Sequence, residues 1–377
     1  MLHQPPGNYG SSLQVADDIA LTTSKDVLEA LVSLFPDAPI FTSLYAPDVM
    51  PEFYCSWDIR PLWSDRLPGI RSHHQPYLPI YPLAWGGLDL SGYDVILSNK
   101  SGFCHGVQTS ESALHICYCL APTRYVWDLD KYIEREGLSK AAALALRPLV
   151  SALRRWDYAA AQRVTQFVAI STEIQARIRQ YYHRDSEIIF PPVDTARFHP
   201  SAVIDDYFLV VSRLIPYKRI DLAVQAATRL GVRLLVGGKG RDLDRLRALA
   251  GPTVEFLGYV PDDQLPDLMA RCKAFIFPGL EDFGITPVQA QAAGRPVIAF
   301  GGGGALDTVI PGRTGEHFPR LTVESLMGVI ADFDPRRYDP AVIRANAQRF
   351  DRSIFERHLT EYIDRAWSEF QRRLKTP

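Results

Sequence analysis

The amino-acid sequence predicts an α/β protein made of two Rossmann-like, doubly wound domains. The chain has 377 residues, which is too long for one ordinary hydrophobic core. Short apolar runs alternate with helix-like segments in both halves, which is the pattern of parallel strands joined by crossover helices. A proline-rich stretch at 190–200 has no apolar period and separates the two series, so we interpret it as the interdomain linker.

The composition is that of a globular protein and narrows the choice of partners. Apolar residues make up 47% and charged residues 22%, and the net charge of −2 gives no reason to expect nucleic acid. The sequence has no apolar run near the ~20 residues of a membrane span, and residues 1–12 lack the pattern of a secretory signal. We therefore expect a cytoplasmic protein. Its five cysteines fit reduced thiols, and Cys117 and Cys119, which share one strand-like run, are expected to be buried.

The first domain is expected to span residues 25–195, after an irregular segment at 1–24 that is rich in Gly, Ser, Pro and Gln. A helical pattern ends before Pro36, and a long Ala, Leu and Arg-rich helix at 138–163 is expected to break or kink at Pro148. The strands are expected within 39–45, 93–99, 115–120, 167–171 and 187–190.

The second domain is expected to span residues 196–350, where strands and helices alternate more regularly. Ligands of such a sheet bind at the carboxyl ends of its strands. The last segment, 351–377, forms one amphipathic helix that we expect to pack back on the N-terminal domain. The strands are expected within 207–212, 232–238, 254–258, 274–279 and 296–300. The apolar stripe of the last helix comprises Phe355, Leu359, Tyr362, Ile363, Ala366 and Phe370.

Two cations follow the first strand of the second domain. Arg213 and Lys218 lie between that strand and the next helix, where a guanidinium fork and an ammonium point charge can bind a diphosphate. They are equally compatible with solvated loop charges. Glycines at Gly237, Gly238 and Gly240 allow close backbone approach after the next strand, although tight turns also need glycine.

The most informative segment is FPGLEDFGITPVQAQAAG, which carries Glu281 just ahead of a helix. Thr286 is expected as the N-cap, Pro287 as the first helical residue and Gln289 as the partner in a capping box. The helix start suits an anion, and the neighbouring carboxylate then suits sugar hydroxyls. The four glycines 301–304 are expected to pack against a ligand or against the facing domain.

These segments resemble family 4 glycosyltransferases of GT-B fold, and among them the bacterial mannosyltransferase-like enzymes of surface polysaccharide assembly. The resemblance covers about residues 25–370 and implies two Rossmann-like domains that face a cleft. Its strongest motifs are SRLIPYKRIDL, VGGKG, EFLGYVPDDQLPDLMARCKAFIFPGLEDFGITPVQAQAAG and GGGGALDTVIPGRTGEHF. PPVDTARF resembles the interdomain signature of the family, and RYVWD resembles a segment of its acceptor domain.

The resemblance implies a role for each of these residues. Arg213 and Lys218 would bind and neutralise the nucleotide diphosphate, so no metal or other cofactor is expected. Glu281 would hold the hydroxyls of the donor sugar, and these three side chains are the implied catalytic residues. The implied donor site comprises Arg213, Lys218, Gly237, Lys239, Glu281, Phe283, Gly284, Ile285, Thr286 and Gln289.

The implied reaction is the transfer of a hexosyl group from a nucleotide-sugar to a glycan or lipid-linked acceptor, with retention at the anomeric carbon. GDP-mannose is the first choice of donor and a UDP-hexose the second. No enzyme nucleophile is expected, because the leaving diphosphate and the acceptor hydroxyl would meet on one face of the sugar.

Three features depart from the family pattern. The second glutamate of its E-x7-E motif is Gln289 here, which removes a charge-assisted hydrogen bond to the ribose. Its His-x-Pro motif is Leu120-Ala121-Pro122 here, and leucine donates no hydrogen bond. Residues 1–25 show no first strand and no glycine-glycine loop, so we expect the N-terminal sheet to lack its first strand.

These departures keep other hypotheses open. One is a nucleotide-sugar-binding pseudoenzyme with little turnover. A GT-B epimerase is less favoured, because the spacing of His105 and His115 does not indicate that chemistry. A phosphorylase would need a lysine that holds a pyridoxal cofactor, which the sequence does not indicate.

Basic residues on the long helix of the first domain suggest a weak peripheral contact with the inner membrane face. They lie among aliphatic residues, as in segments that bind anionic lipid surfaces. A solvated face packed on the first domain is the alternative. The basic residues are Lys140, Arg147, Arg154, Arg155 and Arg163.

Overall fold

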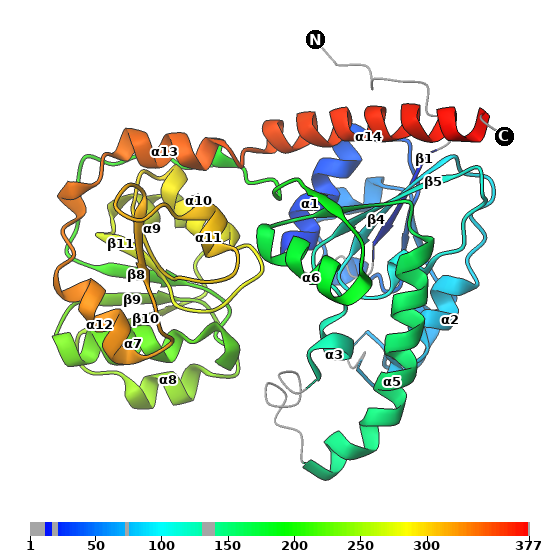
Figure 1. The fold of residues 1–377 in the computed structure, drawn as a ribbon. Coiled ribbons are helices and arrows are strands. Elements are labelled where there is room, and N and C mark those ends of the chain that lie inside the picture. The colour runs from blue at the N-terminus through cyan, green and yellow to red at the C-terminus, as the bar shows by residue number, and fades with distance from the viewer. Residues whose placement is uncertain (1–11, 17–21, 72–74, 130–139, 376–377) are drawn as a thin grey trace. The chain divides into compact units, whose positions relative to one another are not determined.

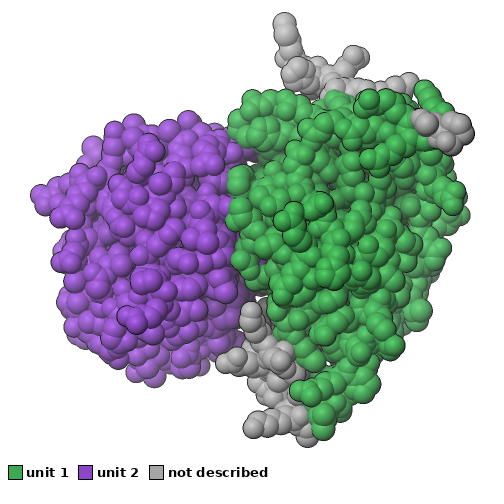
Figure 2. Space-filling model, in the orientation of Figure 1, with its two compact units in different colours: residues 1–192, 353–377 green, residues 193–352 purple. Residues whose placement is uncertain are grey.

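The computed structural model describes residues 12–16, 22–71, 75–129 and 140–375. The chain divides into two compact units, which Figure 2 shows in different colours. Residues 1–192 and 353–377 form the N-terminal unit, and residues 193–352 form the C-terminal unit. Each unit is built on one parallel sheet, which confirms the predicted α/β class with two doubly wound domains.

The N-terminal unit contains a seven-stranded sheet in the order β3-β2-β1-β4-β5-β6-β7. Strands β4 and β5 are buried along their whole length, because helices cover both faces of a doubly wound sheet. The thiols of Cys117 and Cys119 in β5 are free and buried. The strands are β1 (Ser12–Ala16), β2 (Ile40–Thr42), β3 (Ile59–Pro61), β4 (Val95–Lys100), β5 (Leu114–Cys119), β6 (Gln166–Ala169) and β7 (Ser186–Ile188).

The expectation that this sheet lacks its first strand is wrong. β1 lies in the middle of the sheet, paired in parallel with β2 on one side and with β4 on the other. Its register joins Gln14 to Ile40 and to Leu97, so β4 has both of its neighbours. The segment 1–24 is therefore not irregular throughout, and α1 begins at Thr22.

Helices of the N-terminal unit include two of 24 residues, α5 and α14. α5 continues through Pro148, so the expected break is absent from the assigned helix. α14 buries Phe355, whose ring meets Tyr118 of β5 edge-on, and its Arg365 forms an ion pair with Glu187 of β7. The helices are α1 (Thr22–Leu34), α2 (Tyr81–Gly86), α3 (Arg124–Trp127), α5 (Lys140–Arg163), α6 (Thr172–Tyr182) and α14 (Arg352–Lys375).

The C-terminal unit contains a six-stranded sheet in the order β10-β9-β8-β11-β12-β13. Figure 1 shows α7, α8 and α12 on one side of this sheet and α9, α10 and α11 on the other. The strands are β8 (Phe208–Val211), β9 (Leu234–Gly237), β10 (Val254–Gly258), β11 (Ala274–Phe277), β12 (Val297–Phe300) and β13 (Gly315–Phe318). The helices are α7 (Ile220–Leu230), α8 (Leu243–Leu249), α9 (Leu265–Arg271), α10 (Ile285–Ala292), α11 (Ala305–Thr308), α12 (Val323–Ala331) and α13 (Pro340–Gln348).

A buried aspartate on α5 holds several elements of the N-terminal unit together. The Asp157 carboxylate accepts hydrogen bonds from Thr123 Oγ1, Trp127 Nε1 and Tyr182 Oη, each at 2.7 Å. Burial alone raises the pKa of a carboxyl, but the nearby Lys100 ammonium and the donors of Trp127 and Thr123 bring the pKa of Asp157 below its usual value. Asp157 is therefore charged at neutral pH and ties α5 to α3 and α6.

Two histidines of this unit are buried in the neutral state. Burial, together with the charge of Lys100, lowers the pKa of His105 to about 3. Burial, together with Arg163, lowers the pKa of His115 to about 3. His115 Nε2 lies 2.8 Å from Ser98 Oγ on the neighbouring strand β4. Both imidazoles must bind a proton when the unit unfolds in mild acid.

We predict that the N-terminal unit loses stability as the pH falls from about 6.5. The unfolded chain then takes up protons that the folded unit excludes, so each histidine lowers the free energy of unfolding by up to about 1.4 kcal/mol per pH unit. This effect should end near the folded-state pKa of about 3. All six tryptophans belong to this unit, so tryptophan fluorescence during urea unfolding between about pH 7 and about pH 5 measures it.

Replacing His115 with Gln should remove about half of the change in unfolding free energy with pH. His358 is exposed on α14, so His358→Gln serves as the control and should leave the slope unchanged. Stability that stays constant over this pH range would contradict the neutral, buried state of both imidazoles.

Candidate functional site

Four of the loops at the carboxyl edge of the C-terminal sheet surround the predicted donor site. They follow β8, β9, β11 and β12. The strand order reverses direction between β8 and β11, because the chain proceeds from β8 toward one edge of the sheet and from β11 toward the other. Loops diverge at such a reversal and leave a crevice where ligands of doubly wound sheets bind. The residues of the predicted donor site lie on these loops and on the start of α10.

The structure brings Lys218 and Glu281 into contact across this reversal. Lys218 ends a short 3-10 helix (Pro216–Lys218) after β8, and Glu281 lies in the loop after β11. Lys218 Nζ forms an ion pair with Glu281 Oε2, and the two side chains are 14% and 17% exposed. The ammonium and the carboxylate therefore share one partly desolvated position, where charge interactions are stronger than in water.

Backbone geometry fixes this pair. A Cβ on Gly279 would lie 2.8 Å from the Lys218 carbonyl oxygen, so only glycine lets the two loops approach this closely. Arg219 has a φ of 53°, in the left-handed region that non-glycine residues rarely adopt. This turn directs the chain from Lys218 into α7. The fold maintains a strained residue directly beside the cation, as functional sites often do.

The other predicted cations are more exposed. Within the described part of the chain, the side chain of Arg213 makes no hydrogen bond or ion pair. Lys239 lies 5.7 Å from the centroid of the Tyr259 ring. Gly238 has a φ of 133°, and a Cβ there would lie 1.8 Å from the Ser212 carbonyl oxygen, so the loops after β8 and β9 also pack closely. Gly237 is the last, buried residue of β9.

α10 begins differently from the prediction. Its N-cap is Gly284, with a φ of 93°, and no side chain caps the helix. Thr286 is therefore the second helical residue and Gln289 the fifth, so the predicted capping box is wrong. The reason is that glycine adopts this φ without strain, whereas a Thr286 cap would need an extended backbone two residues later. The first amide groups, including those of Ile285 and Thr286, have no acceptor within the helix.

The remaining predicted residues divide into buried and accessible groups. The Phe283 side chain is buried, and its ring packs 5.6 Å from that of Phe350, so only its backbone is placed to meet a ligand. Ile285 is also buried. Thr286 and Gln289 are half-buried, and within the described residues the Gln289 amide side chain has no hydrogen bond. Gln289 is thus able to bond a ligand, which capping would have prevented.

The glycines after β12 serve the loop that carries Glu281. The amide of Gly304 donates to the Glu281 carbonyl oxygen at 2.8 Å, and a Cβ on Gly303 would lie 2.2 Å from the same atom. The expectation that these glycines pack against a ligand or the facing domain stays a prediction. They hold the Glu281 loop from within the same unit.

The carboxyl edge of the N-terminal sheet holds a buried cation that the sequence analysis missed. Lys100 ends β4 with no exposed surface, and its Nζ donates to Thr123 Oγ1 at 3.1 Å and to Ala121 O at 3.3 Å. Leu120 is buried at the end of β5, where its amide donates to the Lys100 carbonyl oxygen. The position that is histidine in the family motif is therefore apolar and covered. A lysine near the end of a predicted strand was the one available signal.

The described residues contain no group of three or more His, Cys, Asp or Glu side chains arranged to hold a metal ion. None of their helices combines the length and the apolarity that crossing a bilayer requires.

Comparison with known proteins identifies the C-terminal unit. Residues 195–349 match the family model described as "Glycosyl transferases group 1". A GDP-mannose-dependent alpha-(1-6)-phosphatidylinositol monomannoside mannosyltransferase from Mycolicibacterium smegmatis is 31% identical over 179 residues. This match covers 39% of the present chain and 47% of the relative, so the chain spans about half the length of the curated relatives it matches.

Solved structures extend the similarity of fold to both units. Sucrose-phosphate synthase from Thermosynechococcus elongatus has a TM-score of 0.72 at 18% identity, over 95% of this chain and 100% of that one. The HepE protein of Anabaena in complex with UDP has a TM-score of 0.70 at 16% identity, over 94% of this chain and 99% of that one. The C-terminal unit therefore matches the glycosyl transferases of group 1, and the fold of both units is that of the GT-B glycosyltransferases.

Proposed function

We propose that this protein transfers a hexosyl group, with mannosyl as the first choice, from a nucleotide-sugar to a glycan or a lipid-linked acceptor. The observation that carries this proposal is the Lys218–Glu281 pair at the reversal of the C-terminal sheet. The donor would be GDP-mannose, because the curated relative uses it, or a UDP-hexose, since HepE was solved with UDP-glucose.

In the proposed complex each group of the site has one task. Lys218 and Arg213 neutralise the leaving diphosphate, and the amides at the start of α10 donate to its oxygens or to the sugar. Glu281 accepts hydrogen bonds from the sugar hydroxyls. Because these cations supply the charge neutralisation, the proposal needs no cofactor.

The proposed reaction retains the anomeric configuration. The bond between the anomeric carbon and the diphosphate breaks, and the acceptor oxygen bonds to that carbon on the same face. The acceptor proton passes to the leaving phosphate oxygen, so no side chain has to act as a nucleophile. The task of the protein is then to orient both substrates and to stabilise the developing charge.

Binding of the donor requires an exchange of partners. In the free protein Glu281 neutralises Lys218. A diphosphate at Lys218 would stand close to the carboxylate and repel it. Glu281 is thereby released to the sugar hydroxyls, so that a complete donor satisfies both side chains. A bare nucleoside diphosphate satisfies the lysine and leaves the carboxylate without a partner.

A second candidate function is nucleotide-sugar binding with little turnover. The buried, apolar Leu120 favours this candidate on the N-terminal side, and Gln289 favours it on the C-terminal side. Incubation with GDP-mannose and UDP-hexoses, with and without acceptor, separates the two candidates. Donor binding without transfer or hydrolysis supports the binding protein.

We predict opposite effects for the two members of the pair. Lys218→Met should weaken the binding of GDP and of GDP-mannose about tenfold or more, because a charge-assisted hydrogen bond contributes about 1.5–3 kcal/mol. Glu281→Gln should leave GDP binding unchanged or tighten it, since the repulsive carboxylate is gone. The same substitution should lower transfer by about a hundredfold or more. Calorimetric titration and an assay of sugar release measure these effects.

Lys273→Met is the matched control for the lysine. Lys273 directly precedes β11, at the opposite edge of the sheet, where it pairs with Asp206. Equal weakening of GDP binding in Lys218→Met and Lys273→Met would contradict the donor site.

Gln289→Glu should tighten the binding of the nucleotide-sugar by about threefold to tenfold. A carboxylate there regains the charge-assisted hydrogen bond to the ribose that the amide lacks. Gln348 is exposed on α13, so Gln348→Glu adds the same charge elsewhere in the unit as a control. Calorimetry on both variants compares them, and an unchanged or weaker affinity in Gln289→Glu would show that this side chain does not face the nucleotide.

We also propose a weak peripheral contact between α5 and anionic membranes. The only acidic residue of this helix, Asp157, is buried, while Arg147, Arg155 and Leu144 are exposed. Sedimentation with phosphatidylglycerol vesicles should detect binding at about 50 mM salt that disappears by about 500 mM, because salt screens surface charge. Binding that does not depend on salt would contradict an electrostatic contact.

A further inference from the structure

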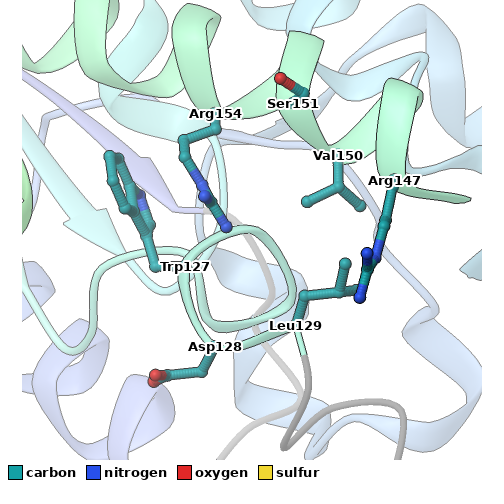
Figure 3. A pocket seen from close by; sticks show the side chains of 7 residues that line it. All are labelled: Trp127, Asp128, Leu129, Arg147, Val150, Ser151 and Arg154. Carbon is teal, nitrogen blue, oxygen red and sulfur yellow. The ribbon is translucent and has the colours of Figure 1, made fainter. Parts of the chain in front are cut away.

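A pocket of the N-terminal unit lies between α3 and α5, and we refer to it as the α3–α5 pocket. Its volume is about 440 Å³, within the range of small-molecule sites. Arg147, Ser151 and Arg154 of α5 form one wall, and Trp127 with Asp128 forms the other (Figure 3). Leu129 and Val150 add apolar surface.

The position of the pocket is that of a ligand site in a parallel sheet. α3 begins five residues after β5 ends, so it belongs to the carboxyl edge of the N-terminal sheet. Figure 1 shows α3 against α5 in this part of the unit. In the proposed function, this edge is the acceptor side.

The wall formed by α3 is rigid. Trp127 donates from Nε1 to the buried Asp157 carboxylate, and its ring stacks on Tyr181 with a centroid distance of 4.9 Å. The Arg154 guanidinium lies 5.3 Å from the Trp127 centroid, and its Nε and Nη2 donate to Val126 O at 3.2 and 2.7 Å. These contacts fix the guanidinium before any ligand arrives, which lowers the entropic cost of binding.

Donor groups in the pocket exceed the acceptors that the protein provides. Within the described residues, Arg154 Nη1, the Arg147 guanidinium and the Ser151 hydroxyl have no hydrogen-bond partner. Arg147 and Arg154 are seven residues apart, so they project from the same face of the helix two turns apart. A group with several negative oxygens would satisfy these donors together.

Among the described residues that line the pocket, the one carboxylate, Asp128, does not oppose such a ligand. Asp128 Oδ1 accepts from the Tyr181 hydroxyl at 3.2 Å, and Figure 3 shows its carboxylate pointing away from Arg147. The described lining of the pocket therefore has two guanidinium groups, against one carboxylate that already has a partner.

We propose that the α3–α5 pocket binds a phosphate group of the acceptor, with Arg147 and Arg154 as the recognising cations. A phosphate offers three terminal oxygens, enough for both guanidinium groups and the Ser151 hydroxyl. The assignment of this phosphate to the acceptor rests on the proposed transferase function. The binding of phosphate by the pocket does not, because its residues belong to the other unit from the donor site.

The test uses glucose 1-phosphate as the probe and the full-length Arg213→Gln/Lys218→Met double variant, in which the candidate donor site is disabled. Calorimetry should detect one site in this variant. Adding Arg147→Gln should weaken it about tenfold or more, because a bond between two charged groups is lost. Arg155 is the matched control, an exposed arginine of α5 that does not line the pocket. Arg155→Gln should change the affinity less than about twofold.

Comparison of probe binding in the variants distinguishes a specific phosphate pocket from an unspecific basic surface. Loss of probe binding in Arg147→Gln but not in Arg155→Gln supports the pocket. Equal loss in both indicates an unspecific basic surface and overturns the proposal, as does a double variant that binds no probe. Ser151→Ala, expected to weaken binding by about threefold, tests the pocket without changing its charge.

Two further measurements identify the source of the phosphate and show whether the donor site is unaffected by the substitution. If a lipid headgroup supplies the phosphate, Arg147→Gln should weaken binding to vesicles that contain phosphatidic acid more than Arg155→Gln does. If a soluble sugar phosphate supplies it, the two variants should bind these vesicles equally. GDP titration of the Arg147→Gln single variant should match the unmodified protein. Failure of GDP binding in the unmodified protein would contradict the proposed donor site and leave the phosphate result as it stands.

Discussion

The reversal of strand order between β8 and β11 is the constraint on which the candidate site depends. Parallel strands all present their carboxyl ends at one edge, and only at the reversal do adjacent loops diverge. Lys218 and Glu281 are far apart in the sequence, yet they meet because their loops follow these two neighbouring strands. Gly279 allows the approach, and Gly303 and Gly304 hold the acidic loop from the other side. The geometry of the pair thus follows from topology and from a few glycines.

The two units prepare their polar groups in opposite ways. In the C-terminal unit Lys218 and Glu281 neutralise each other while they keep some exposure, so a ligand is able to replace either partner. In the N-terminal unit Asp157 is fully buried and takes three hydrogen bonds, so its network is permanent. Removing one partner of such a buried network costs much stability. The Asp157 network therefore holds α3 against α5. The exchangeable Lys218–Glu281 pair is suited to binding a substrate, and the permanent Asp157 network is suited to holding the helices in place.

Much of the fold was predictable because its signals are local. Buried parallel strands are runs of apolar residues, and those at 95–100, 114–119, 208–211 and 274–277 were all found. β1 escaped because SLQVA is short, partly polar and surrounded by Gly, Ser and Pro, and its place in the sheet comes from tertiary pairing. The predicted capping box is wrong because Thr286 has the right residue type for a cap, whereas the helix begins after Gly284, two positions earlier.

The sequence predicted less about the site wherever function depends on contacts between loops that are far apart in the chain. The motifs identified Lys218 and Glu281 separately, but nothing in their spacing shows that they pair in the free protein. Asp157 was overlooked because a single acid in a basic helix resembles a surface charge, and only its burial reveals its role. Lys100 was likewise hidden at the end of a strand, where the pattern has no means of showing that its ammonium turns inward to Thr123.

The most direct test of the central claim is a crystal structure of this protein with GDP-mannose or with a UDP-hexose. We predict a diphosphate oxygen within hydrogen-bonding distance of Lys218 Nζ, near the first amides of α10, with the Glu281 carboxylate moved to the sugar hydroxyls. A nucleotide bound elsewhere, or one bound here while Lys218 and Glu281 keep their mutual ion pair, would contradict it.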